Sequence, residues 1–297
     1  MQKNFVPEGN LGLSRRKIPV FLLLFFLSIF ALRLIDSFCL RTDQGPIGEL
    51  FAHKLAGFAL LIASVRFLRL KWSSDIGFKP EQLLREILTG LAIGGSAFLA
   101  AYTAEIGIAV MQGKSPSLQF YAASYNITGN TLLDSGVSFL LICVIGNVIN
   151  VAMENSVFSG LMISVAEKRY SFLTANGFFS SFLFGLWHSV MPLRNFIDGS
   201  QSLAGAVTAA LMLFGASFLF SVQLGMQFKQ ASSLWDGMTV HFINNLSVNL
   251  IHIVFADGSE NAPAMRIAIA PTIMFVVVTV RYFGWKKAAR CSQEVSD

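Results

Sequence analysis

Long apolar runs constrain this chain more than any other feature of its sequence. Hydrophobic residues make up 54% of the 297 residues and charged residues only 13%, a composition far too apolar for a soluble fold. A run of about 20 apolar residues is long enough to cross a bilayer as a helix. Eight such runs are present, at 18–38, 50–70, 87–111, 135–166, 172–191, 203–226, 234–255 and 265–285.

The predicted fold is therefore all-α. We expect a polytopic membrane protein in which residues 1–297 form one transmembrane domain, a single bundle of about eight transmembrane helices. The first run follows Arg15, Arg16 and Lys17, as a signal peptide would. It is longer than the usual apolar core of about 7 to 15 residues and ends without a small-x-small cleavage site, so we expect it to stay as a helix.

The Lys and Arg residues of the short loops predict the orientation of the bundle. With the N-terminus inside, most basic residues fall on the inner side, and the outer side has only Arg41, Lys54, Lys114, Arg194 and Arg266. Both termini are therefore predicted to lie in the cytoplasm. The net charge of +5 then reflects topology and contact with the lipid bilayer, and no nucleic-acid motif is visible.

Polar segments between the runs predict connectors. Residues 72–85 are typical of a short interfacial stretch, and residues 112–134 and 257–263 are typical of outer loops. The three cysteines, Cys39, Cys143 and Cys291, have neither metal-site nor redox-motif spacing, so no disulfide framework is predicted.

Polar side chains recur at helical spacing inside three of the apolar runs, which places them on one face of each helix. In the fifth run, Ser181 and His188 share a face. At 1.5 Å per residue, Glu154, His188, His241 and Asn245 all lie about 18 to 24 Å from the inner ends of their helices, so we predict that they occupy one layer. The other members of these faces are Asn147 and Asn150 in the fourth run and Asn249 and His252 in the seventh.

A purely structural role is the alternative for many of these side chains. Intramembrane Asn and Ser often serve as interhelical hydrogen-bonding groups worth about 0.6 kcal/mol each. We assign that role to Asn147, Asn150, Asn249 and Ser181, and a structural role near the outer interface to His53 and His252. We also expect Arg33 and Asp36 to form a local ion pair, and Glu105 to be solvated at the outer surface.

Glu154, His188 and His241 are harder to explain as structure, because an ionisable group at bilayer depth costs about 2.5 to 3.5 kcal/mol and usually serves a function. A buried carboxylate suits a general base, and a histidine can relay the proton that it takes. His241 and Asn245, four residues apart on one helix, can donate hydrogen bonds to a developing oxyanion. These groups suffice for a hydrolase that attacks a peptide bond with water and uses no Ser or Cys nucleophile.

Three short motifs carry a resemblance to a known family. The segments Phe184-Gly-Leu-Trp-His188 and His241-Phe-Ile-Asn-Asn245 match the patterns Phe-x-x-x-His and His-x-x-x-Asn. The segment Glu154-Asn155-Ser-Val-Phe-Ser159-Gly is similar to Glu-Glu-x-x-x-Arg followed by Gly. In order and helix placement these motifs resemble the CPBP (ABI) family of CAAX prenyl endopeptidases and bacteriocin-processing intramembrane proteases. The resemblance covers about residues 80–255, and with the lack of targeting signals it implies a bacterial plasma membrane.

The resemblance implies a role for each matching residue. Glu154 and His188 would activate the hydrolytic water, and His241 and Asn245 would hold the oxyanion, with Phe184 as a supporting residue. A metal-dependent alternative would have zinc held by Glu154, His188 and His241. Because the chain has no helical His-Glu-x-x-His, we favour the mechanism without metal and predict no other cofactor.

The first motif departs from the family pattern at two positions. Asn155 stands where the family has its second Glu, and Ser159 stands where it has Arg. These positions are four apart on a helix, the spacing of a side-chain ion pair. When both charges are lost, neither is left unpaired in lipid. Losing only one would leave the other buried without a partner, at a cost of about 3 to 5 kcal/mol. Our hypothesis is that a supporting ion pair became a neutral pair, while Glu154, His188, His241 and Asn245 were retained.

Three functions are compatible with these residues. The first is an intramembrane endopeptidase that hydrolyses a membrane-associated peptide or protein, in peptide export, bacteriocin maturation or self-immunity. The second is a non-catalytic pseudoprotease that binds and regulates a membrane-protein partner. A small transporter is disfavoured, because the sequence has neither internal repeats nor broken helices in matching positions. Nothing in the sequence indicates whether a substrate is prenylated.

Overall fold

The computed structural model describes residues 13–44, 51–121, 136–260 and 264–294. Within these ranges the chain forms eight successive helical bodies, in agreement with the predicted all-α fold. Two π-helical stretches, η6 (Ser156–Met162) and η7 (Ala175–Phe182), join shorter α-helices into the fourth and fifth bodies. The α-helices are α1 (Ile18–Ile35), α2 (Ala52–Phe67), α3 (Leu83–Met111), α4 (Val137–Asn155), α5 (Ile163–Ala166), α6 (Phe172–Thr174), α7 (Leu183–His188), α8 (Val190–Ile197), α9 (Leu203–Ala231), α10 (Trp235–Leu250) and α11 (Ala264–Glu294).

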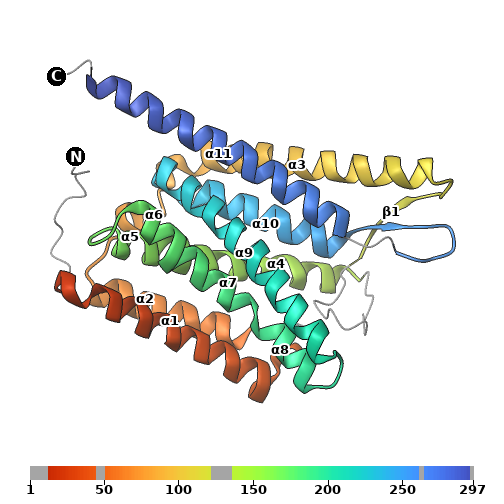
Figure 1. Cartoon of the computed structure of the whole chain (residues 1–297), viewed down its shortest axis with the longest axis horizontal. Helices are drawn as coiled ribbons and strands as arrows, with labels where there is room; N and C mark the ends of the chain where they lie inside the picture. The colour runs from red at the N-terminus through yellow and green to blue at the C-terminus, as the bar shows by residue number, and fades with distance from the viewer. Residues whose placement is uncertain (1–12, 45–50, 122–135, 261–263, 295–297) are drawn as a thin grey trace.

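The helices lie roughly along one direction (Figure 1). Helices α3 and α11 form one side of the bundle and α1 and α2 the other, with α4, α7 and α10 between them. Among the described residues, five helices are long and apolar enough to cross a membrane. Helices α2 and α10 have 16 residues each, or about 24 Å of helix at 1.5 Å per residue, and they pack against longer neighbours.

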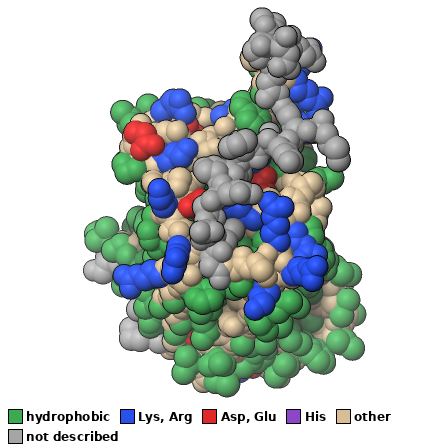
Figure 2. All heavy atoms as spheres, turned by 90° about the vertical axis from the view of Figure 1, so that its left-hand side faces the viewer, with side chains coloured by type: hydrophobic (Ala, Val, Ile, Leu, Met, Phe, Trp, Pro, Cys, Tyr) green, Lys and Arg blue, Asp and Glu red, His purple; other side chains and the backbone are tan. Residues whose placement is uncertain are grey.

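One end of the bundle gathers basic side chains, and the described chain both begins and ends there (Figures 1 and 2). The Lys229 ammonium lies 2.6 Å from a Glu167 carboxylate oxygen and so joins the end of α9 to the turn after α5. Arg169 in the same turn donates to the Arg15 carbonyl at 3.0 Å, which ties the start of the first helical body to this end. The basic ends of four helical bodies therefore share one surface.

Ion pairs also join chain segments at the opposite end. The Arg194 guanidinium in α8 lies 2.8 Å from Asp43 and 3.3 Å from Asp198, and Asp198 pairs with Arg41. Because Arg41 and Asp43 follow α1, these contacts hold the C-terminal end of α1 against α8. The Arg41 guanidinium lowers the pKa of the Asp198 carboxyl below its ordinary value by hydrogen bonding to it.

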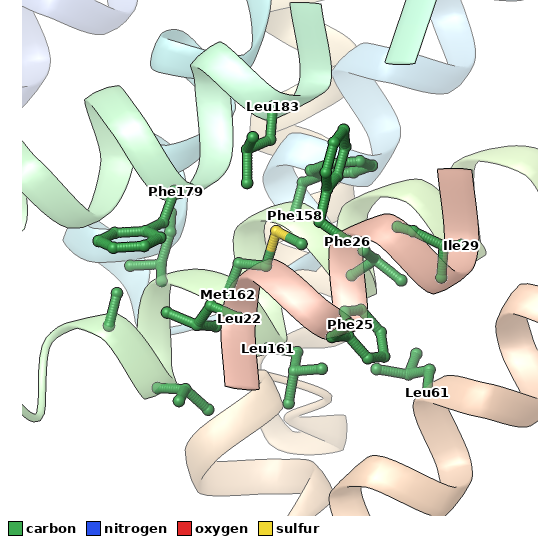
Figure 3. Close-up of a cluster of buried hydrophobic side chains, with 14 of the residues drawn as sticks. Leu22, Phe25, Phe26, Ile29, Leu61, Phe158, Leu161, Met162, Phe179 and Leu183 are labelled. Carbon is green, nitrogen blue, oxygen red and sulfur yellow. The ribbon is translucent and has the colours of Figure 1, made fainter. Parts of the chain in front are cut away.

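Two clusters of buried apolar side chains form the interior. Figure 3 shows the first, where α1 and α2 pack against η6, η7 and α7 through Phe25, Phe158, Met162 and Leu183. The second cluster joins α3, α9, α10 and α11. Each cluster is close-packed around its own helices, so the boundary between them is where polar groups from both halves can meet without disrupting either.

The seventh helical body is shorter than predicted. Helix α10 ends at Leu250, and β2 (Ile251–Val254) pairs antiparallel with β1 (Ser117–Phe120). The Tyr102 hydroxyl donates to the Ser247 carbonyl at 2.6 Å and thereby caps the end of α10. Ile251, Ile253 and Val254 are β-branched residues that favour a strand. The prediction that His252 continues the polar face of this helix is therefore wrong.

The fifth helical body also differs from its prediction. Helix α7 ends at His188, and Ser189 separates it from the short helix α8, which carries the chain on to Ile197. The connector prediction at 72–85 corresponds to two short helical turns, η4 (Trp72–Ile76) and η5 (Pro80–Gln82). Most of the predicted outer loop at 112–134 lies outside the described residues.

The prediction that Glu105 is solvated is wrong. Its side chain is buried, and a carboxylate oxygen lies 3.1 Å from Arg266 Nε, which is also buried. Helices α3 and α11 lie side by side, so each charge has its partner on the neighbouring helix. Lys54, another residue assigned to the outer side, is buried in α2 as well.

We expect Gly90→Ala to destabilise the packing of α3 against α10. A Cβ at Gly90 would lie 2.6 Å from Thr239 Cβ and 2.8 Å from the Asp236 carbonyl oxygen, so one helix must move. Overpacking of this kind costs about 1 to 3 kcal/mol. The measurement is the free energy of unfolding of the purified protein in detergent.

Gly95→Ala is the matched control on the same helix. A Cβ there meets nothing within 4 Å, and Ala is favoured over Gly in a helix by about 1 kcal/mol. Equal stability of the two variants would contradict the close approach of α3 and α10.

Candidate active site

Glu154 is a buried carboxylate near the end of α4. Its side chain is about 4% exposed, and Oε1 accepts a hydrogen bond from Trp187 Nε1 at 3.0 Å. Within the described part of the chain, Oε2 has no hydrogen-bond partner. One carboxylate oxygen is thus held in place by an indole, while the other remains able to accept a proton or a hydrogen bond.

His241 approaches this second oxygen from α10. Its Nε2 lies 3.8 Å from Glu154 Oε2, and the imidazole is buried. The Asn155 side-chain amide lies 2.7 Å from His241 Nδ1. Consecutive residues, Glu154 and Asn155, therefore lie against opposite nitrogens of one imidazole.

His188 lies at the end of α7 and is half-buried. Its Nδ1 donates to the Phe184 carbonyl at 2.9 Å, so Nε2 keeps its lone pair. The Phe184 ring centroid is 4.4 Å from that of His188 and 6.3 Å from that of His241. Phe184 thus packs near both imidazoles.

Asn245 is one turn beyond His241 on α10 and is half-buried. Its Oδ1 accepts from Asn244 Nδ2 at 3.3 Å, and within the described residues it makes no hydrogen bond to Glu154, His188 or His241. The structure therefore brings Glu154 and His241 into direct proximity, places His188 against Phe184, and leaves Asn245 as a neighbour of His241 on the same helix.

The sequence reasoning missed Trp187 and misassigned Arg33. The Arg33 guanidinium carbon lies 4.5 Å from the centroid of the Trp187 ring, whose Nε1 holds Glu154. Asp36 bonds Thr42 and His53, so the predicted Arg33–Asp36 ion pair is wrong. One feature of the sequence does point to Trp187. It has an indole N–H inside an apolar run, and a buried indole N–H usually donates to an acceptor nearby.

Both helical bodies that supply Glu154 and His188 contain a π-helical stretch beside the site. The stretch η6 begins two residues after Glu154, and η7 ends two residues before Phe184. Such stretches are rare and are frequent at functional sites, because they change the direction in which neighbouring side chains point. Here they lie where α4 and α7 face each other across the buried carboxylate.

Asn147 and Ser181, two polar side chains of the predicted faces, have partners within their own helical bodies. Asn147 donates to the Cys143 carbonyl at 3.0 Å, and Ser181 donates to Asn176 Oδ1 at 3.3 Å, so these two bonds do not join helices as predicted. Ser159 is buried in η6, and its hydroxyl has no hydrogen-bond partner in the described part of the chain.

Zinc held by Glu154, His188 and His241 is the alternative that the sequence leaves open. Among the described residues, no group of three or more His, Cys, Asp or Glu side chains is arranged to hold a metal ion. His241 has Nδ1 against Asn155 and Nε2 3.8 Å from Glu154 Oε2. We therefore derive no chemical step through a metal.

The apolar helices define a multi-pass helical membrane protein, and a Glu–His pair is buried inside its bundle. Residues 136–247 match a family model described as Type II CAAX prenyl endopeptidase Rce1-like. This segment contains Glu154, His188, His241 and Asn245, and the match supports the resemblance to the CPBP family. No curated protein and no solved structure matches the chain significantly.

We expect Trp187→Phe to lower stability by about 1 to 3 kcal/mol, because it leaves Glu154 Oε1 buried without its donor. The same substitution made in a Glu154→Leu background should cost much less, since no carboxylate is then left unsatisfied. Free energies of unfolding of the four proteins form a double-mutant cycle that isolates this hydrogen bond. Equal costs in both backgrounds would show that Trp187 acts only by filling space.

Proposed function

We propose that this protein is an intramembrane endopeptidase that hydrolyses a membrane-associated peptide or protein. The observation that carries the proposal is the buried Glu154 carboxylate, one oxygen of which is held by Trp187 while the other is unbonded beside His241. Burying such a group in an apolar bundle lowers the stability of the fold, and a catalytic role explains why the group is nevertheless present. The family match supports the same reaction class.

The proposed reaction uses water as the nucleophile. Glu154 Oε2 takes a proton from the water molecule while the water oxygen attacks the scissile carbonyl carbon. The carbonyl oxygen then becomes an oxyanion. His188 assists through Nε2, which has its lone pair because Nδ1 donates to the Phe184 carbonyl. When the tetrahedral intermediate breaks the C–N bond, the proton held by Glu154 passes to the leaving amine.

In this proposal, two side chains of α10 stabilise the oxyanion. His241 is buried beside the carboxylate, and a hydrogen-bond donor fixed in a low-dielectric site stabilises developing charge far better than water does. Asn245, one turn further along, is the second proposed donor. It is half-buried and is bonded in the described structure only through Asn244, so its amide can turn toward a substrate.

The proposed setting is a plasma membrane, with both termini in the cytoplasm. The support is the gathering of basic side chains at the end where the described chain begins and ends (Figure 2), because such side chains favour the cytoplasmic surface. Bacterial origin and a role in bacteriocin processing remain predictions. The proposed partners are the lipid bilayer and the substrate, with no nucleic acid.

A second candidate is a non-catalytic member of the family that binds another membrane protein. The observation that favours it is the loss of both charges of the first motif at Asn155 and Ser159, which are buried. The test is the Asn155→Glu, Ser159→Arg double variant, which restores both charges together. Under the protease proposal this variant gains no activity over the natural chain; cleavage by the variant alone would identify the natural protein as a pseudoprotease.

The protease proposal predicts that Glu154→Gln abolishes cleavage and leaves the protein level unchanged. The amide keeps an oxygen to accept from Trp187 but cannot take a proton from water. The measurement compares the termini of membrane peptides, by mass spectrometry, in cells expressing the natural protein or the variant at equal abundance.

Glu81→Gln is the matched control, because Glu81 is an exposed carboxylate in η5, far along the chain from the site. Termini that vanish only with Glu154→Gln would support the proposal and identify the substrate. Identical termini in all three samples would overturn it in favour of the binding partner.

A further inference from the structure

The Asn155 carboxamide has its orientation set by two backbone groups. The Val151 carbonyl can only accept a hydrogen bond, and the Met238 N–H can only donate one. The contacts match these roles when the amide nitrogen faces Val151 O at 3.3 Å and the amide oxygen faces Met238 N at 3.2 Å. The Met238 N–H also donates to the Leu234 carbonyl at 2.8 Å, so Asn155 is its second acceptor. In this orientation the amide nitrogen also donates to His241 Nδ1 at 2.7 Å.

This hydrogen bond selects one tautomer of His241. A ring nitrogen that accepts a hydrogen bond carries no proton, so the neutral imidazole has its proton on Nε2. That nitrogen lies 3.8 Å from Glu154 Oε2, on the side of the ring that faces the candidate active site. His241 is therefore presented to the site as a hydrogen-bond donor.

The other three histidines of the chain have the opposite arrangement at Nδ1. In each case Nδ1 faces an oxygen that accepts: the Phe184 carbonyl at 2.9 Å from His188, Asp36 Oδ2 at 2.8 Å from His53, and Glu260 Oε1 at 2.7 Å from His252. The sequence contains four histidines, and all four lie in the described part of the chain. His241 alone faces an amide donor at this nitrogen.

We propose that Asn155 is a positioning residue that holds His241 in the Nε2–H tautomer. A carboxylate at position 155 could only accept a hydrogen bond and would impose the reverse tautomer, with the proton on Nδ1 and a lone pair on Nε2. The replacement of Glu by Asn in the first motif therefore changes what His241 offers to the site. Its catalytic meaning, donation to the oxyanion, rests on the proposed function.

The same tautomer disfavours the binding of zinc through His241. A metal ion binds the lone pair of a ring nitrogen, and the second nitrogen of a metal-bound histidine normally donates to an acceptor. With Nδ1 accepting from Asn155, binding through Nε2 would require an imidazole without either proton. Asn155 thus leaves His241 Nε2 without a lone pair for a metal ion and keeps that nitrogen as a hydrogen-bond donor.

The test is nitrogen-15 NMR of the full-length protein in detergent, with the label only in histidine. Protonated and unprotonated ring nitrogens resonate far apart, so each tautomer is read directly. We expect one histidine of the four to be in the Nε2–H form in the natural protein, and its signals to disappear in His241→Gln, which assigns them.

Asn155→Asp is nearly the same size and reverses the polarity of the contact. We expect it to convert His241 to a form protonated on Nδ1 and to lower the rate of substrate cleavage at least tenfold, with KM little changed. Asn155→Leu, which fills the space but makes no hydrogen bond, should leave His241 in a mixture of tautomers and serves if the Asp variant fails to fold.

Two results would overturn the inference: a natural protein in which His241 carries a proton on Nδ1, or a tautomer unchanged by both substitutions at Asn155. The tautomer is measured without a substrate, so it tests Asn155 independently of peptide cleavage. A negative result with Glu154→Gln in cells would reject the protease and leave the tautomer result intact.

Discussion

The burial of one carboxylate, that of Glu154, sets a requirement that the surrounding side chains have to meet. A charge that has left water must be compensated by donors and by opposite charge, or it costs several kcal/mol. Trp187 supplies the donor, and Arg33 lies over the face of the same indole. His241 approaches from the other apolar cluster. The two halves of the bundle therefore meet at a group that neither could bury alone.

Much of this arrangement could be predicted from the sequence. Apolar runs gave the helical bodies, because only a helix or a closed barrel satisfies the backbone in lipid. The spacing of Glu154 and His241 along their helices placed both at one depth. Polar side chains that avoid lipid face the interior of the bundle, so two of them at the same depth are expected to lie near each other. Their proximity of 3.8 Å follows from that reasoning.

The partners on other helices could not be predicted. Helical periodicity gives the face of a residue but not the neighbour across from it, so Arg33 was paired with Asp36 on its own helix when it lies over Trp187. Glu105 was assigned to solvent for the same reason, although α11 brings Arg266 to it. The tautomer of His241 depends on an amide whose orientation is set by two backbone groups, one of them on another helix, and no sequence pattern records such a contact.

The π-helical stretches set the directions of the side chains beside the site. In η6 and η7 each turn holds an additional residue relative to an α-helix. Removing that residue would restore α-helical spacing and leave the flanking segments in nearly the same rotational phase, but it would redirect the side chains within the stretch. In η6 these include Phe158 and Met162, which belong to the first apolar cluster. The packing of that cluster beside Glu154 therefore depends on one residue that an α-helix would not need.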